Sequence, residues 1–558
     1  MFSGRTTALL SAAAMIFIAP AHAQTPDHMV DISADEIART VKTMTLDQFE
    51  GRAPGTAGED RTIGYLIGRF EALGLEPGGV DGSWTQAVPL LHTTLGKPDT
   101  LSVSNKGKTT ALNAGKDIYV STLQPKDRAV VEDAEMVFVG YGVTAPERGW
   151  DDFKDVDLKG KVAVFLVNDP DFAAAAGEAV AGKFGGRAMT YYGRWTYKFE
   201  EASRRGAVAA LIIHETEAAG YGWSVVESPQ GENYGIAKPS GEMTSLALQG
   251  WVSGETAQSL FDDAGLDLAK LRIAARKSDF KPVSIGATFT AAYPVKQEVV
   301  KSQNVFGKIT GKSRPDETII YGAHWDAYGE GPPDKDGKIY RAGANDDALG
   351  IAGIMEIARK FKSMPQPERT IVIAAWSAEE RGLLGSEVYA QAPIYPVETT
   401  VANLAIDVLQ TAGKAKDVIL VGKGQGTLED DLAKFAGLQG RVVTQESLPE
   451  RGLFFRADHF SLAKRGVPVL LMMSLAGASD LVEGGKPAGQ KWIDDYTGNC
   501  YHAACDAWSP DWDLAGALQD INVMFDIGHS LANSERWPEW KAGSEFKKLR
   551  DASAEARR

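Results

Sequence analysis

The sequence predicts an α/β fold in which a mixed, mainly parallel sheet is flanked by helices. The first observation is a set of short runs that are apolar throughout, at residues 318–324, 369–376, 401–407 and 467–473. Strands of this kind are buried on both faces, as in parallel sheets covered by helices. The second observation is the amphipathic helical pattern of residues 351–361, which lies between two of these runs.

The length and composition are those of a globular protein with more than one domain. The 558 residues suggest two or three domains, and the hydrophobic content of 44% is ordinary for a globular protein. The formal net charge is −15. Nucleic-acid binding requires a basic face, so we expect no nucleic-acid partner. The oligomeric state has no signature in the sequence.

The first 23 residues have the pattern of a secretory signal peptide. Arg5 supplies a basic start, residues 8–19 are mostly apolar, and residues 21–23 read Ala-His-Ala, a typical cleavage site. A membrane anchor is the alternative, but a spanning helix needs roughly 20 apolar residues. We therefore expect export to the periplasm or the medium, no membrane span, and an environment in which a disulfide persists.

The sequence pattern of the mature chain changes at three points. Residues 24–110 contain an amphipathic helix and form the first part of the α/β domain. Residues 111–282 read as an insertion of short strands and glycine-rich turns, and residues 283–540 complete the α/β domain. Residues 541–558 form a charged tail that we expect to be frayed.

Polar residues stand where the predicted strands end. They are His324 and Asp326, Asp346 and Asp347, Glu379 and Glu380, Asp407, and the later His502. Each has an ordinary explanation when taken alone: acidic pairs cap helices or offset helix dipoles, and a histidine can be a hydrogen-bonded core residue. However, ligands of open α/β sheets collect beyond the carboxyl ends of the strands.

Taken together, these residues form a ligand set of imidazoles and carboxylates without a thiolate. That set suits two divalent metal ions, and zinc is the usual choice. Of the adjacent pair Glu379 and Glu380, one can bind metal while the other stays free as a base.

The order of these motifs resembles a known family. The motifs H-x-D from His324, N-D-D-x-x-G from Asn345, E-E-x-G from Glu379 and Y-H at Tyr501 are similar to those of metallopeptidase family twenty-eight. This family of di-zinc exopeptidases includes secreted bacterial aminopeptidases and glutamate carboxypeptidase II. The stretches KGKVAVFLVND and ASRRGAVAALII are similar to its protease-associated (PA) domain. The resemblance implies a zinc exopeptidase fold with an inserted β-rich PA domain.

The resemblance also implies a metal ligand at each of five positions. Asp346 would bridge two zinc ions. His324 and Asp407 would complete one site, and Glu380 and His502 would complete the other. Each ion would then keep an open position, as catalytic zinc does.

Three further residues receive roles from the same resemblance. Asp326 would orient His324 from behind, as outer partners of metal ligands do. Glu379 would act as general base, and Tyr501 would direct its hydroxyl at the developing oxyanion. The implied activity is removal of N-terminal residues from peptide substrates by an aminopeptidase.

Other activities use the same fold. A carboxypeptidase or dipeptidase is one alternative, since pocket residues without a motif decide the branch. A related deacylase family carries its extra domain after the E-E motif, whereas the insertion here precedes His324. Glutaminyl cyclase, with one zinc ion, and a non-catalytic receptor-like binding protein are the remaining alternatives. The complete set of five ligand positions argues against the latter.

The two cysteines of the chain, Cys500 and Cys505, flank Tyr501 and His502. In an exported protein we expect them to form a disulfide, which would hold the Tyr-His pair in place. A metal-binding pair is the alternative, but the chain has no further cysteine to complete such a site.

Overall fold

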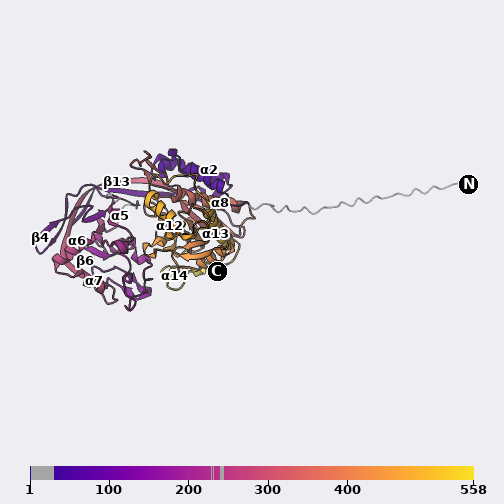
Figure 1. Cartoon of the computed structure of the whole chain (residues 1–558). Coiled ribbons are helices and arrows are strands. Elements are labelled where there is room, and N and C mark those ends of the chain that lie inside the picture. The colour runs from indigo at the N-terminus through magenta and orange to yellow at the C-terminus, as the bar shows by residue number, and fades with distance from the viewer. Residues whose placement is uncertain (2–29, 228, 230, 239–243, 558) are drawn as a thin grey trace.

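The computed structural model of the protein describes residues 1, 30–227, 229, 231–238 and 244–557. From its second residue onwards, the predicted signal peptide lies outside the described residues. The described chain forms two lobes (Figure 1). Helices α2, α8 and α13 belong to one lobe and helices α6 and α7 to the other, while the long strand β13 extends between the two.

The sheet of the first lobe confirms the predicted mixed α/β fold. Its strands follow the order β21-β18-β14-β17-β13. Four of them are parallel to one another: β14 (Arg314–His324), β17 (Arg369–Trp376), β18 (Thr400–Ile406) and β21 (Val469–Met472). The fifth, β13 (Val283–Ile309), runs antiparallel to β17.

Helices cover both faces of this sheet. Successive side chains of a strand point to opposite faces, so neighbouring residues of one strand enter different core clusters. Ile371 and Ile373 of β17 lie in one core cluster, and Val372 and Ala374 lie in another. The first cluster is completed by α1 (Ala34–Met44), α2 (Ala57–Ala72), α8 (Leu349–Lys362) and α13 (Ala515–Ala532). The second receives side chains from α9 (Leu384–Gln391) and α11 (His459–Ala463).

The second lobe has a sheet of its own. Its order continues from β13 as β6-β9-β10-β12-β5. The strands are β6 (Arg128–Phe138), β9 (Val162–Leu166), β10 (Ala209–Ile213), β12 (Leu248–Val252) and β5 (Ile118–Ser121). Helices α3 (Trp195–Arg204), α6 (Gly254–Ala264) and α7 (Leu268–Ala275) accompany them. The insertion is therefore built of parallel strands and helices as well as hairpins.

Strand β13 belongs to both sheets. Its residues 287–292 pair with β3 (Thr100–Asn105), and its residues 295–305 pair with β2 (Thr85–Leu95). The change from one sheet to the other thus falls near Leu95 and Val295. Proline usually marks the end or edge of a strand, and Pro294 lies at this crossing.

Two segments return to the first lobe. Strand β11 (Glu232–Ile236), from the insertion, pairs antiparallel with β2. The C-terminal segment forms α14 (Lys547–Ala552), where the guanidinium of the buried Arg550 donates to the carbonyl of Val397 at 3.3 Å. The expectation of a frayed tail is therefore wrong for the described residues.

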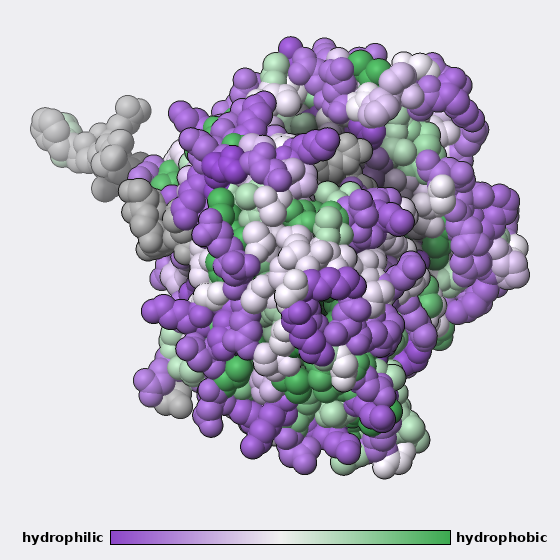
Figure 2. All heavy atoms as spheres, turned by 90° about the vertical axis from the view of Figure 1, so that its left-hand side faces the viewer, coloured by the Kyte–Doolittle hydropathy of each residue, from purple (hydrophilic) through white to green (hydrophobic). Residues whose placement is uncertain are grey.

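The remaining elements are short. They are β1 (Glu76–Pro77), β4 (Lys108–Ala111), β7 (Thr144–Ala145), β8 (Trp150–Asp151), β15 (Gly329–Glu330), β16 (Tyr340–Arg341), β19 (Asp417–Leu420), β20 (Val442–Gln445), α4 (Thr216–Ala219), α5 (Trp223–Glu227), α10 (Leu428–Leu438) and α12 (Gly485–Asp495). The side of the second lobe is mostly hydrophilic, with apolar side chains in separate areas (Figure 2). Within the described ranges, no helix is both long and apolar enough to cross a bilayer.

Candidate metal centre

The carboxyl ends of three neighbouring parallel strands bring the predicted site residues together. His324 ends β14, the pair Glu379 and Glu380 follows β17, and Asp407 follows β18. Asp346 lies in the turn that precedes α8. This is the edge where open α/β sheets collect their ligands.

Two groups of ligand atoms share one residue at this edge. His324, Asp346 and Asp407 each offer an atom within 4.8 Å of the others, and Asp346, Glu380 and His502 form a second such group. One oxygen of Asp346, Oδ1, lies 3.0 Å from His324 Nε2. Its other oxygen, Oδ2, lies 3.2 Å from His502 Nε2. The carboxylate of Asp346 therefore faces both groups at once.

The turn that carries Asp346 depends on two glycines. Gly343 has φ +53°, and a Cβ there would lie 2.2 Å from the carbonyl oxygen of Asp346. A Cβ on Gly350 would lie 2.2 Å from Asp347 Oδ1, which accepts the Gly350 N–H at 2.8 Å. Asp347 thus accepts an N–H of the first turn of α8, and the Asp346 side chain is directed at the histidines.

Asp326 contacts His324 through its backbone, and its carboxylate has a further task. The backbone carbonyl of Asp326 accepts the hydrogen bond from His324 Nδ1, at 3.0 Å, whereas its carboxylate oxygen is 3.7 Å away. That carboxylate instead accepts the backbone N–H groups of Glu379 at 3.0 Å and Glu380 at 3.4 Å. Asp326 therefore fixes the turn that presents the two glutamates.

Burial disfavours the ionised form of most carboxyl groups of the site. It raises the pKa of Glu379 and Glu380 well above the usual range and that of Asp407 to about 7. Burial also opposes ionisation of Asp346, but the nearby imidazoles of His324 and His502 outweigh it and lower the pKa of Asp346. A carboxylate between two imidazoles, beside three further carboxyl groups, is suited to cations.

Several ligand atoms have no other use in the fold. Among the described residues, Asp346 Oδ2, Glu380 Oε1 and His502 Nε2 are buried without a hydrogen-bond partner. Buried polar atoms are usually paired, and unpaired ones call for an ion or a water molecule. Three-residue sets of imidazole and carboxylate match the donor types of catalytic zinc sites. The residues present therefore fit zinc.

Aromatic rings enclose His502. The ring of Tyr501 stacks on the imidazole with centroids 3.7 Å apart, and the ring of Tyr328 lies 4.4 Å away. Burial raises the pKa of the Tyr501 hydroxyl well above its usual range, so this phenol keeps its proton and can donate a hydrogen bond. Tyr328 was missed by the sequence analysis, although it follows Asp326 closely as an aromatic residue at a strand end.

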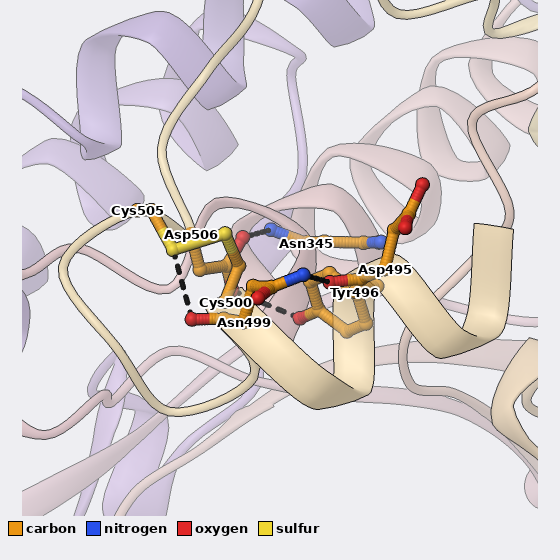
Figure 3. The surroundings of a disulfide bond; sticks show 7 residues. All are labelled: Asn345, Asp495, Tyr496, Asn499, Cys500, Cys505 and Asp506. Atoms are coloured by element: carbon orange, nitrogen blue, oxygen red, sulfur yellow. Dashed lines mark hydrogen bonds between the residues drawn. A yellow bond between two sulfur atoms is a disulfide. The ribbon is translucent and has the colours of Figure 1, made fainter. Parts of the chain in front are cut away.

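The loop that carries Tyr501 and His502 is closed by a disulfide between Cys500 and Cys505 (Figure 3). His502 has φ +61°, an uncommon backbone conformation for a residue with a side chain. A short covalent loop restricts the chain around such a residue. His502 remains the most exposed of the ligand candidates, at 28% of its side chain.

Arg52 is a second residue that the sequence analysis missed. Its side chain is fully buried and donates to the carbonyls of Trp325 at 2.7 Å and Gly343 at 2.8 Å. It therefore ties the end of β14 to the turn of Asp346. The stretch EGRAPG that contains Arg52 is similar to the N-terminal part of the resembled family, but only the contacts reveal this role.

A mixed α/β sheet with two overlapping histidine and carboxylate groups at its strand ends defines a metal-binding centre of the metallohydrolase type. Residues 304–525, which contain every ligand candidate, match the model of peptidase family M28. This segment, which is less than half of the chain, is thus similar to peptidase family M28.

The similar proteins include peptidases of two kinds. A probable glutamate carboxypeptidase of Arabidopsis thaliana is 33% identical over 118 residues, which is 20% of this chain and 16% of that protein. An aminopeptidase of Mus musculus is 34% identical over 117 residues, which is 20% of this chain and 14% of that protein. The alignments thus span less than a fifth of the length of either relative.

Among solved structures, an aminopeptidase from Aneurinibacillus sp. strain AM-1 is similar, with a TM-score of 0.45 and 18% identity over 90% of this chain and 94% of that one. A zinc aminopeptidase from Bacillus subtilis has a TM-score of 0.41 and 17% identity, covering 92% of this chain and 99% of that one.

Proposed function

We propose that this protein is an exported exopeptidase that binds two zinc ions and removes N-terminal residues from peptides. The observation that carries the proposal is the position of Asp346, whose two carboxylate oxygens face two separate ligand groups. His324 and Asp407 would hold one ion, Glu380 and His502 would hold the other, and Asp346 would contribute to both.

When bound, a pair of zinc ions polarises the scissile carbonyl and activates a water molecule. Glu379 supplies the proton transfer. It belongs to neither ligand group, yet its Oε2 lies 3.9 Å from His324 Nε2 at the edge of the site. A carboxylate at this place can take a proton from water and deliver it to the leaving amine.

Tyr501 is the proposed oxyanion donor. Its hydroxyl stays protonated because burial raises its pKa, and its ring is fixed against His502. A preorganised donor of this kind stabilises charge that develops on the substrate carbonyl oxygen. The disulfide between Cys500 and Cys505 supports the proposal of export, since disulfides persist in oxidising compartments.

The aminopeptidase assignment uses the acidity of the site. Asp407 is buried beside the proposed metal positions, and the Glu379 side chain there is 10% exposed. A free substrate ammonium could pair with either of these carboxyl groups. The mouse relative is named an aminopeptidase, which agrees with this assignment.

A carboxypeptidase or dipeptidase is the second candidate, and one observation favours it. Arg194 of the insertion is only 8% exposed, and its Nε has no hydrogen-bond partner among the described residues. Burial and the nearby Arg456 lower the pKa of Arg194 to about 10. Two neighbouring guanidinium groups, one of them buried, could receive the C-terminal carboxylate of a peptide.

We also propose that the insertion, which we predict to span residues 111–282 and to resemble a PA domain, restricts access to the site. Two contacts support this idea: the Met189 N–H donates to the Pro449 carbonyl at 3.2 Å, and the rings of Tyr191 and Phe460 lie 5.2 Å apart. Loss of these contacts should widen the range of peptide lengths that are cleaved.

The deciding experiment compares one tripeptide in three forms: with free ends, N-acetylated, and C-amidated. An aminopeptidase cleaves the free and the amidated forms, whereas a carboxypeptidase cleaves the free and the acetylated forms. If none of the three forms is cleaved and fewer than two zinc ions bind, the proposal fails. That result would favour a receptor-like protein or a glutaminyl cyclase.

Glu379→Gln tests the chemistry. We expect kcat to fall by about 100- to 10,000-fold while the zinc content is retained, because general-base catalysis contributes that much. The control is Glu356→Gln, another buried glutamate, which pairs with Arg359 at 2.7 Å on α8 and not with the site. Full activity of Glu379→Gln would refute the assigned role.

A further inference from the structure

Asp506 follows Cys505 directly and is buried, at 3% exposure. Figure 3 shows its carboxylate between Asn345 and Tyr496. The carboxylate accepts the N–H of Asn345 at 2.9 Å, the N–H of Asp346 at 3.2 Å and the hydroxyl of Tyr496 at 3.0 Å. Asp506 belongs to none of the ligand motifs and to neither of the two ligand groups.

The backbone of Asp506 continues the same contact. Its carbonyl accepts the N–H of Ala344 at 3.1 Å. Three successive N–H groups, those of residues 344–346, therefore all donate to Asp506. Hydrogen bonds to a carboxylate are stronger than those to a neutral acceptor. Asp506 thus fixes the backbone from which the Asp346 side chain extends toward both histidines.

Asn345 connects Asp506 with the segment that follows β18. The Asn345 side-chain oxygen accepts the N–H of Leu409 at 3.1 Å, two residues after Asp407. Asp506 therefore holds a turn that is itself connected to the backbone beside Asp407.

We propose that Asp506 is a positioning residue for both metal sites, acting through Asp346. This inference rests on the proposed two-zinc function and deepens it. One short loop, closed by the disulfide, then has two tasks. It supplies His502 to one site, and through Asp506 it holds the carboxylate that both sites share.

A merely structural role for Asp506 makes a different prediction. If the loop served the metals only through His502, disturbing it would weaken the single site that His502 shares with Glu380. If Asp506 positions Asp346, disturbing Asp506 weakens both binding steps. Counting the binding steps that change therefore separates the two roles without any measurement of activity.

The experiment titrates zinc-free full-length protein with buffered zinc and follows the ions bound per chain. Its variants are Asp506→Ala, Asp506→Asn and His502→Ala, with circular dichroism as a check of folding. The matched control is Asp520→Asn, because Asp520 is equally buried, at 4% exposure, and pairs with Arg441 at 2.6 Å outside the site.

We expect His502→Ala to weaken one binding step and Asp506→Ala to weaken both by about 10- to 100-fold, the usual effect of losing an outer partner of a ligand. Asp506→Asn should weaken both steps less, because its remaining carbonyl oxygen still accepts one N–H. Asp520→Asn should change neither step.

Wild-type affinity at either step in Asp506→Ala would overturn the inference. Should that variant fail to fold, Asp506→Asn decides the question, and two unchanged steps in it would overturn the inference equally. If the wild-type protein itself binds fewer than two zinc ions, the proposed function fails together with the inference. Two ions in the wild type and unchanged Asp506 variants would reject the inference alone.

Discussion

Replacing Asp326 by alanine tests how the site is held. Its carboxylate is fully buried and accepts the N–H groups of Glu379 at 3.0 Å and Glu380 at 3.4 Å. Alanine would leave both donors buried without a partner, which costs about 1–3 kcal/mol for each one. The longer bond exceeds the usual range and counts least. We expect a loss of about 2–4 kcal/mol in the free energy of unfolding.

The assay combines urea unfolding of zinc-loaded protein with zinc competition against a chelating dye. Asp326→Ala should lower zinc affinity by about 10- to 100-fold. Because the backbone carbonyl of Asp326 still holds His324, the site of Glu380 should lose more affinity than the site of His324. Asp326→Asn keeps one acceptor oxygen and should lose less. Unchanged unfolding and affinity in Asp326→Ala would refute the reasoning.

Three further outcomes are expected. Tyr501→Phe should lower kcat on the order of 100-fold with zinc retained, and an unchanged kcat would remove its hydroxyl from the mechanism. Replacing Cys500 and Cys505 by serine should cost about 2 kcal/mol in urea unfolding, because the disulfide closes a short loop; equal stability of the double variant would contradict this. The hydrogen bond to Glu232 of β11 raises the pKa of His92 above 6.5. The pairing of protonated His92 with Glu232 therefore stabilises β11 fully below pH 6.5, and this stabilisation is lost as the pH rises through the pKa of the folded state. Hydrogen exchange of β11, corrected for intrinsic rates, should therefore quicken at alkaline pH, and the same pH dependence in His92→Gln would disprove the link.

Three of the ligand candidates could be placed together because each ends or follows an apolar strand. Parallel strands end at one edge of a sheet, so His324, Glu380 and Asp407 had to lie near one another. The structure does bring them together there. Their assigned roles stay predictions until zinc binding is measured.

The contacts that hold the ligands could not be predicted in the same way. Asp326 accepts hydrogen bonds from two backbone N–H groups of a different turn. Asp506 accepts hydrogen bonds from the backbone of a turn more than a hundred residues earlier in the chain. Backbone donors carry no residue type, so no motif records them. Arg52 escaped notice for the same reason, since its acceptors are carbonyl groups.

The sheet that each short strand joins was also beyond the sequence. Period-two patterning indicates a strand but does not tell which of two sheets it joins. Residues 100–105 and 108–111 look like any hairpin, yet they belong to the sheet of the second lobe. Strand β13 continues through Pro294 and joins both sheets.

Strand β13 has a mechanical consequence. Its 27 residues pass from one sheet into the other without a loop. A hinge between domains needs a few residues that can change their backbone angles freely, and residues paired in a sheet ladder are less able to do so. Tyr293 and Pro294 still pair with β6 and Val295 already pairs with β2, so no unpaired stretch of β13 separates the two lobes. We therefore expect little hinge motion at this crossing. Transplanting the insertion into a relative would have to include this strand, because cutting it would leave an unpaired edge strand that invites aggregation.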